Sequence, residues 1–148
     1  MPKIKHIAMT AKDPQKVANF YMELFDMKEV GRSGDSHIYL SDGEMNLTIR
    51  TVKAAGSPDV GEGGAGFEGI HHIGFTVDDI ENYSEKAIKA GAKMLSPMQV
   101  AAAAGSGSES TVKTRPDRSN AEVKISGPNG VVLDMSESGW IGNYVADI

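Results

Sequence analysis

The sequence contains no cysteine among its 148 residues. This absence excludes disulfides, thiolate metal sites and a cysteine nucleophile. Long hydrophobic runs are also missing, because no stretch approaches the roughly 20 apolar residues that a membrane-spanning helix needs. The N-terminus "MPKIKH" lacks the pattern of a signal peptide. Together these features predict a cytoplasmic protein that does not bind a membrane.

Aromatic and basic residues are sparse. Aromatics make up 6% of the chain, and the formal net charge is −5. Nucleic-acid binding calls for a basic face that meets the phosphates, so nucleic acid is excluded as a partner. The one local basic cluster, "KTRPDR" at 113–118, is short and typical of a solvated loop. With 40% hydrophobic residues, the chain has the composition of one compact domain with a buried core.

The most informative feature is an internal repeat. "KHIAMTAKD" at 5–13 and "HHIGFTVDD" at 71–79 share one pattern at a spacing of 66 positions. Such self-similarity indicates that the chain folds as two copies of one structural unit. The identical pairs are His6 and His72, Ile7 and Ile73, Thr10 and Thr76, and Asp13 and Asp79, and the similar pairs are Ala8 and Gly74, and Met9 and Phe75.

Each half of the chain is expected to contain one helix and four strands in the order βαβββ. The strands are predicted from alternating apolar and polar residues, and the helices from apolar residues at helical spacing after an aspartate cap. The sequence therefore predicts an α+β fold of two tandem modules. The first module has expected strands at 4–11, 28–31, 37–40 and 45–51 and a helix at 14–25; the second has expected strands at 70–77, 92–96, 121–126 and 131–136 and a helix at 80–90.

Composition also divides the chain. A glycine-rich stretch that contains Pro58 reads as a linker between the modules. The segment 100–119 is an expected loop, and loops of this length in a compact domain are usually functional or disordered. It could close as a lid, with Lys113, Arg115 and Arg118 reaching an anionic substrate. The expected single domain comprises module one at 1–53, the linker at 54–69, module two at 70–137 and a C-terminal tail at 138–148.

Strand alternation decides which way the two repeated histidines face. In the second copy, Ile73 and Phe75 belong to the apolar row that packs under the following helix. His72 then faces the opposite way, and the same reasoning places His6 on that face in the first copy. His71 is expected on the helix side or at the strand edge, and therefore not as the partner of His6.

The last strand of the second module adds a carboxylate to this face. Asp134 alternates with Leu133 and Met135, and a buried acid without a partner is costly. A polar concave face with His6, His72 and Asp134 is therefore predicted. Two imidazoles and a carboxylate suit iron, manganese, nickel or zinc and leave coordination positions open for a substrate. The alternatives are histidines that form structural hydrogen bonds, and an Asp134 that pairs with Arg50 or Lys124.

The paired strands and the closing "GPNGVVLDMSE" at 127–137 resemble the vicinal oxygen chelate superfamily, over residues 4 to about 137. This superfamily includes glyoxalase I, methylmalonyl-CoA epimerase, extradiol dioxygenases, fosfomycin-resistance thiol transferases and bleomycin-binding proteins. The resemblance implies two βαβββ modules whose mixed β-sheet encloses a cup around a divalent metal ion. It leaves open whether the cup forms within one chain or across two.

The resemblance also implies ligand positions. The first-strand histidines correspond to His6 and His72, and the acid of the final strand corresponds to Asp134, where the family usually has glutamate. The remaining position falls at Asn46, or at Thr48 if the register slips. Because an amide is a poor base, Asn46 does not favour proton-shuttling isomerisation between two carboxylates. The remaining set matches the pattern of two histidines and one carboxylate found in extradiol dioxygenases and fosfomycin-resistance enzymes.

The resulting hypothesis is a metal-dependent enzyme, dioxygenase-like or a glyoxalase-like lyase or isomerase, that acts on a small oxygenated substrate. The competing hypothesis is a metal-free protein that sequesters a drug or metabolite, as bleomycin-binding proteins do. Asn46 and the short side chain of Asp134 favour the second. The candidate catalytic residues are His37 and Tyr39, the candidate substrate-binding residues are Asn46, Thr48, Lys124 and Arg115, and Glu122 is a further candidate for lining the cup.

The tail predicts association between chains. Trp140 and Tyr144 are aromatic residues that water would not favour, and the modules leave sheet edges that need cover. A homodimer is expected, with the tail packed on a neighbouring sheet or on the partner.

Overall fold

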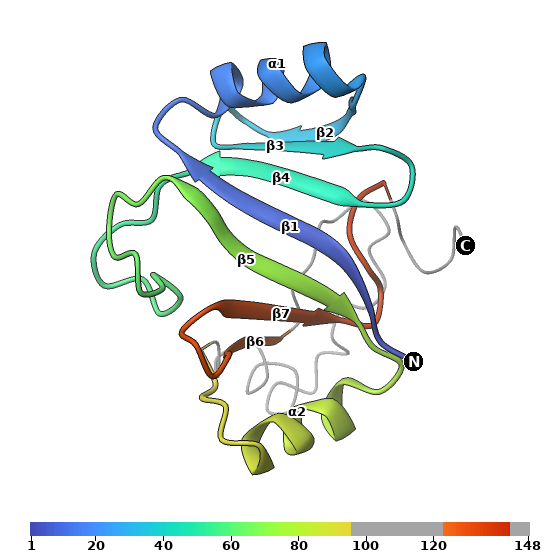
Figure 1. Ribbon diagram of the computed structural model, residues 1–148, viewed down its shortest axis with the longest axis vertical. Helices are drawn as coiled ribbons and strands as arrows, with labels where there is room; N and C mark the ends of the chain where they lie inside the picture. The colour runs from blue at the N-terminus through green and yellow to red at the C-terminus, as the bar shows by residue number, and fades with distance from the viewer. Residues whose placement is uncertain (96–122, 143–148) are drawn as a thin grey trace.

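The structure is a computed structural model that describes residues 1–95 and 123–142. Two helices and seven strands make up this described part (Figure 1). Of its helices, neither has the length and apolar character to cross a membrane. In chain order the elements are β1 (Lys3–Ala11), α1 (Pro14–Phe25), β2 (Lys28–Ser33), β3 (His37–Ser41), β4 (Asn46–Thr51), β5 (Gly69–Thr76), α2 (Ile80–Lys89), β6 (Val123–Ser126) and β7 (Val132–Ser136).

The repeated aspartates begin both helices, as the sequence predicts. The side chain of Asp13 accepts a hydrogen bond from the backbone N–H of Lys16 at 3.1 Å, and Pro14 fills the first helical position. Asp79 accepts in the same way from the backbone N–H of Asn82 at 2.9 Å. Each repeat therefore turns from strand to helix by the same local chemistry.

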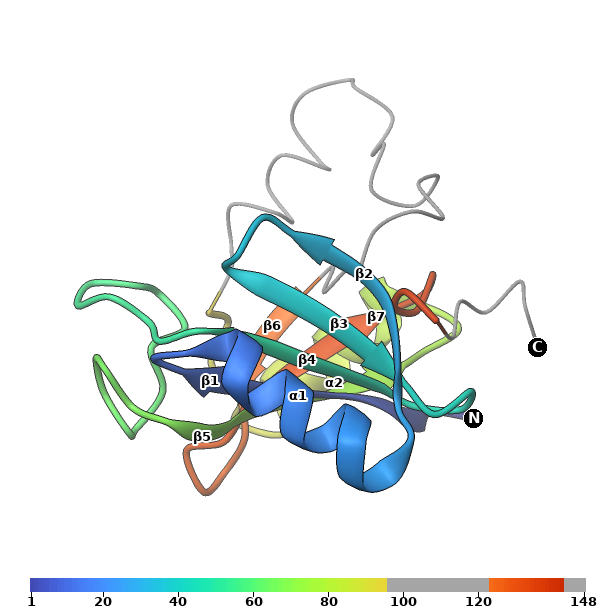
Figure 2. The same ribbon diagram turned by 90° about the horizontal axis from the view of Figure 1, so that it is seen from above.

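The strands form one seven-stranded mixed sheet in the order β2-β3-β4-β1-β5-β7-β6. Strands β1 and β5 pair antiparallel in the middle, and each has a parallel neighbour from its own module, β4 or β7. Figure 1 shows the two helices at opposite ends of this sheet, and Figure 2 shows α1 lying over the strands of the first module. The α+β prediction is confirmed, and the sheet that joins the modules forms within one chain.

The prediction of a second strand in the second module is wrong for the residues of it that the structure describes, 92–95. A strand was expected at 92–96, but residues 92–95 make only an isolated bridge, between Met94 and Ile125. Two backbone hydrogen bonds accompany it, from Leu95 to Lys124 at 2.8 Å and from Ser126 to Lys93 at 2.9 Å. Apolar alternation over four residues cannot separate a single bridge from a strand.

Two apolar clusters hold the helices against one face of the sheet. Under α1, the buried side chains include Ile38, Leu40 and Ile49, with Ile7 and Met9 packed against them. A smaller cluster fills the equivalent space under α2, and Ile73 and Phe75, which were expected there, are not among its members. Its buried members are Val77, Ile80, Val123, Ile125 and Met135. Because strand side chains alternate, the residues between these positions line the opposite face.

The pairing of β1 with β5 gives the molecule an approximate two-fold axis. Ile7 lies opposite Ile73, while His6 lies opposite Gly74 and Ala8 lies opposite His72. Exchanging the two copies of the repeat reproduces the same pairs, so the axis passes through the Ile7–Ile73 pair. His6 and His72 therefore occupy equivalent places on either side of this axis.

The first residues of the tail return from the second module to the first. Trp140 is 1% exposed and packs over Gly74, beside His6. Ile141 and Gly142 follow it to β2 and β3, where they lie against Gly31 and Ser41. The tail therefore packs on the sheet of its own chain up to residue 142. Tyr144 lies outside the described residues.

Replacing Gly74 by alanine should destabilise the protein, because there is no room for the added methyl group. A Cβ at this position would stand 2.6 Å from Cζ2 of Trp140 and 2.8 Å from Cβ of His6. Overpacking of this kind costs about 1–3 kcal/mol, measurable as a lower midpoint of urea unfolding. The double variant Gly74→Ala with Trp140→Phe should lose less stability than the two single losses combined. Equal stability of Gly74→Ala and the wild type would contradict the close packing.

Candidate metal centre

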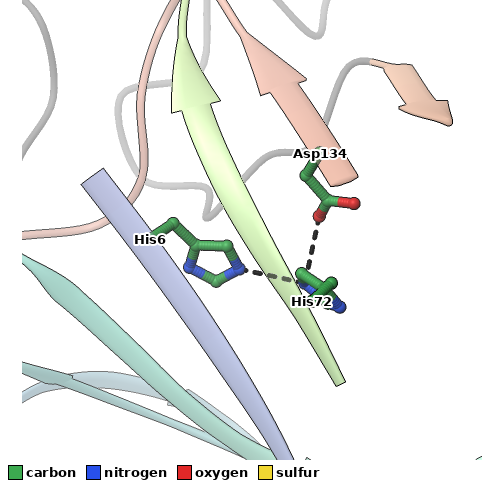
Figure 3. Close-up of side chains that lie close together, drawn as sticks. All are labelled: His6, His72 and Asp134. Atoms are coloured by element: carbon green, nitrogen blue, oxygen red, sulfur yellow. Dashed lines mark hydrogen bonds and ion pairs between the residues drawn. The ribbon is translucent and has the colours of Figure 1, made fainter. Parts of the chain in front are cut away.

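Three buried side chains converge from three strands at the middle of the concave face. Figure 3 shows His6 from β1, His72 from β5 and Asp134 from β7 directed toward one another. Nε2 of His72 lies 3.0 Å from Nε2 of His6 and 3.0 Å from Oδ2 of Asp134. None of the three residues is more than 3% exposed. The predicted convergence of the two histidines is confirmed.

The spacing of these atoms suits a metal ion. One donor atom from each residue can be chosen so that all three lie within 4.8 Å of one another. Two donors that each lie about 2.1 Å from a metal at a right angle are about 3.0 Å apart, as observed for both contacts of His72. Oδ1 of Asp134 is buried without a hydrogen-bond partner among the described residues. Two imidazoles with an underused buried carboxylate therefore fit a divalent cation.

Hydrogen bonds fix the orientation of the His6 ring. Its Nδ1–H donates to Oδ1 of Asn46 at 2.6 Å, since a carbonyl oxygen can only accept. Asn46 is itself held, because it accepts from Oγ1 of Thr48 and donates to the carbonyl of Ile141, both at 2.8 Å. Trp140 stacks on the ring, with centroids 4.7 Å apart and planes 4° from parallel. The lone pair of Nε2 consequently points at His72.

Electrostatics keep His6 neutral and Asp134 ionised. Burial, assisted by the nearby His72, lowers the pKa of His6 from 6.5 to about 3. Burial opposes ionisation of Asp134, but His72 and Lys124 more than offset it and lower its pKa to about 2. A neutral imidazole and a carboxylate are the protonation states that a metal ion requires.

The side chain of His71 lies in a different place from the one predicted. The register of β5 against β1 moves from Ala8–His72 directly to Met9–Ile70, which leaves His71 as the extra residue of a β-bulge. The side chain was expected on the helix side or at the strand edge, but its Nδ1 lies 2.7 Å from Nδ1 of His72, which faces the other way. As expected, the partner of His6 is His72 and not His71. The expected alternation fails because the bulge brings two consecutive side chains together.

Strand pairing also identifies the first-module position that corresponds to Asp134. Asp134 lies opposite Gly74 on β5, and the equivalent residue of β1, Ala8, lies opposite Thr48. Thr48 is therefore the counterpart of Asp134, whereas Asn46 lies beside His6. The hydroxyl of Thr48 supports Asn46. The first module therefore has a hydroxyl, and not a carboxylate, at this position.

One end of the cup is rich in cations. Lys53 and Lys124 both donate to Asp59, at distances of 2.8–3.0 Å, and Lys124 also lies 3.8 Å from Oδ2 of Asp134. Burial opposes ionisation of Asp59, but its hydrogen bonds with the two lysines lower its pKa. Arg50 occupies the same face of β4, two residues beyond Thr48. Among the described residues it has no ion pair, so the suggested Arg50–Asp134 pair is not formed.

The remaining candidates lie around this end or outside the described residues. His37 pairs with Arg50 across the sheet, and Tyr39 pairs with Thr48. Burial and the charge of Arg50 lower the pKa of His37 to about 4, while burial raises the pKa of Tyr39. Both side chains are therefore neutral near pH 7. The candidates Arg115, Lys113, Arg118 and Glu122 fall outside the described residues.

Three residues of the site were missed by sequence reasoning. Asp59 lies within a glycine-rich linker and has no periodic pattern around it. The role of His71 depends on a bulge, which no local residue signals. Trp140 was expected to pack somewhere, but a tail residue gives no information about which sheet position it reaches.

Comparison with known proteins places the chain in a structural context. The model of the family described as the Glyoxalase/Bleomycin resistance protein/Dioxygenase superfamily matches residues 3–131. No curated protein matches the sequence. Similar solved structures include a hypothetical protein from Bacillus halodurans C-125, with 18% identity, a TM-score of 0.57, and coverage of 90% of this chain and 92% of the other.

Two enzymes are among the similar structures. A methylmalonyl-CoA epimerase in complex with methylmalonyl-CoA has 16% identity and a TM-score of 0.56, over 91% of this chain and 93% of the other. A mutant of 4-hydroxymandelate synthase from Streptomyces coelicolor has 14% identity and a TM-score of 0.57, over 90% of this chain but 36% of the other. At such identities the likeness concerns the fold alone.

The metal-free protein should lose stability as the pH falls from 7 to 5. The folded-state pKa of His6 is about 3 and its ordinary value is 6.5, so the unfolded chain binds more protons in this range. The free energy of unfolding should therefore fall by about 1.4 kcal/mol per pH unit below 6.5 on account of this residue. His37 and His71, each with a pKa lowered to about 4, act in the same direction.

Urea unfolding at several pH values, with a chelator present, measures this effect. The variant His6→Gln removes one of the titrating groups and should show a shallower dependence on pH than the wild type. Identical slopes for the two proteins would contradict a buried neutral His6.

Proposed function

Because the chain belongs to the glyoxalase/bleomycin resistance protein/dioxygenase superfamily, we propose that it is a divalent-metal-dependent enzyme acting on a small oxygenated substrate in its cup. The observation that supports this most directly is the buried convergence of His6, His72 and Asp134. The buried Oδ1 of Asp134 has no hydrogen-bond partner among the described residues, and a bound cation would satisfy it.

His6, His72 and Asp134 would hold the ion. When bound, the ion acts as a Lewis acid that stabilises negative charge on two neighbouring substrate oxygens. The chain's own contribution is orientation of the ligands. Asn46 accepts a hydrogen bond from the Nδ1–H of His6, and Nδ1 of His71 can accept one from the Nδ1–H of His72, so that the lone pairs of both Nε2 atoms are available.

Within the superfamily, the donor set favours dioxygenase-like chemistry over isomerisation between two carboxylates. Asp134 is the carboxylate of the group, and its counterpart in the first module is Thr48. A site with two histidines and one carboxylate is the pattern of non-haem iron oxygenases. An iron-dependent oxygenation is therefore the first candidate, and a glyoxalase-like lyase or isomerase reaction is the second.

His37 is the proposed base, and Tyr39 is the proposed acid. Both extend from β3 on the face that holds His6, His72 and Asp134, called the metal-capable group below. A neutral imidazole can accept a proton from the substrate, and a protonated phenol can donate one. Nδ1 of His37 lies 2.8 Å from Oγ of Ser36, which leaves Nε2 for this role.

The alternative function is metal-free binding of a drug or metabolite in the same cup. Thr48 at the position equivalent to Asp134 favours it, because one carboxylate binds an ion less strongly than two. The two functions differ in a property that can be measured without knowing the substrate, which is the metal content of the purified protein.

Protein purified without chelator should contain one divalent metal ion per chain, as determined by inductively coupled plasma mass spectrometry. His72→Ala and Asp134→Asn should each lower metal affinity at least about tenfold, because each removes a donor atom. His37→Ala is the matched control and should retain the metal, since His37 lies outside the convergent group. A protein that stays metal-free after incubation with iron, manganese, nickel and zinc, yet binds ligands, would favour the alternative.

A homodimer is also proposed, although His6, His72 and Asp134 converge within one chain. The outer face of α1 exposes apolar side chains that a partner could cover, with Phe20 at 55%, Leu24 at 57% and Phe25 at 60%. Light scattering should give twice the chain mass of 15.7 kDa. Leu24→Asp should shift the protein toward monomer, whereas Lys16→Asp on the same helix should not. A wild-type monomer at high concentration would contradict association.

A further inference from the structure

Arg50 is a cation on the concave face that forms no ion pair within the described part of the chain, although the charges of Asp59 and Asp134 act on it from a distance. On β4 it follows Thr48 at the next position of the same face, between Thr10 of β1 and His37 of β3. Same-face neighbours on a strand are separated by about 6.8 Å. Arg50 therefore stands one row of side chains away from the residues around the metal-capable group.

The guanidinium of Arg50 is not satisfied by the described part of the chain. Its Nε atom is buried and has no hydrogen-bond partner there. The other arginine of the described sheet behaves differently, because Arg32 donates two hydrogen bonds to Glu29 at 2.6 and 2.8 Å. A partly buried cation without a partner is costly unless a ligand supplies the opposite charge.

The nearby acids are engaged elsewhere. Asp59 accepts hydrogen bonds from both Lys53 and Lys124, and Asp134 lies against His72. Among the described residues, three cations thus share two carboxylates in this region: Arg50, Lys53 and Lys124 against Asp59 and Asp134. Tyr39 and His37, the titratable residues of β3 near Arg50, are neutral near pH 7. Of the three cations, Arg50 is the one that forms no ion pair with a residue described in the structure.

We propose that Arg50 binds a carboxylate of the substrate, so that the substrate is a small oxygenated acid such as a 2-oxo or 2-hydroxy acid. This inference rests on the proposed function, since it assigns the substrate class of the same cup. The planar guanidinium pairs with a carboxylate through two parallel N–H···O bonds. A phosphate fits less well, because such sites combine several free donors, and both lysines here are bonded to Asp59.

Calorimetric titration with acids and their amides tests the assignment. The probes are pyruvate, 2-oxobutyrate and phenylpyruvate, each compared with its uncharged amide, on protein prepared with and without metal. At least one acid should bind the wild type about tenfold or more tightly than its amide. Arg50→Gln should weaken acid binding about tenfold to a hundredfold, the range expected for hydrogen bonds to a charged group, and should leave amide binding unchanged.

Two further variants make the result specific. Arg32→Gln, which removes an exposed arginine of β2 that donates to Gln15 of α1 on the helix side of the sheet, should bind the acids as the wild type does. Arg50→Lys keeps the charge but loses the two parallel N–H donors of the guanidinium. Its affinity for the acids should lie between that of the wild type and that of Arg50→Gln. Arg50→Gln should fold with an unchanged or higher melting temperature, since it removes an unpaired cation. If it fails to fold, the acid–amide comparison on the wild type and on Arg50→Lys decides.

The outcomes separate this inference from the proposed function. Acid binding that depends on Arg50 in a protein that takes up no metal would support the anion site and contradict metal dependence. One metal per chain, together with acid binding unaffected by Arg50→Gln, would overturn the anion site alone. Equal binding of acids and amides would overturn it as well, and so would tighter binding of inorganic phosphate than of all three acids.

Discussion

The antiparallel pairing of β1 with β5 is the constraint on which the remaining structure depends. It joins the two modules into one sheet and sets the register in which His6 lies opposite Gly74 and Ala8 lies opposite His72. Because the side chains of a strand alternate, a slip by one residue would turn both histidines to the helix side. The small residues at Ala8 and Gly74 matter for the same reason. Each leaves room for the imidazole that extends from the opposite strand.

Much of this architecture could be predicted because it is written in local patterns that occur twice. The repeat gave the modules, the aspartate caps gave the helix starts, and alternation gave the face shared by His6, His72 and Asp134. Features that depend on long-range geometry could not be predicted in this way. Strand register and the path of the chain are specified by no short stretch of sequence. They determine the bulge at His71, the position of Asp59 between two lysines and the equivalence of Thr48 with Asp134.

The centre of the cup combines groups that would be unfavourable if each were buried alone. His6 is held in one tautomer by Asn46, and Asn46 is fixed in turn by Thr48 and by the backbone of Ile141. The tail therefore reaches the metal-capable group through hydrogen bonds as well as through the ring of Trp140. Both modules and the tail are needed to build the site, since each supplies side chains that the others position.

The two ends of the cup differ although the fold is nearly symmetric. Trp140 and Ile141 fill the end near Asn46, while Arg50, Lys53 and Lys124 surround the other end, about 13 Å away along β4. A symmetric cup would accept a small molecule in two opposite orientations. With an aromatic wall at one end and positive charge at the other, the cup would hold a substrate with one acidic end, as proposed above, in a single direction. The same face of its reactive carbon would then always meet His6 and His72, so the proposed chemistry would give one enantiomer. On that proposal, the handedness of the product would follow from a C-terminal segment that breaks the symmetry of a duplicated fold.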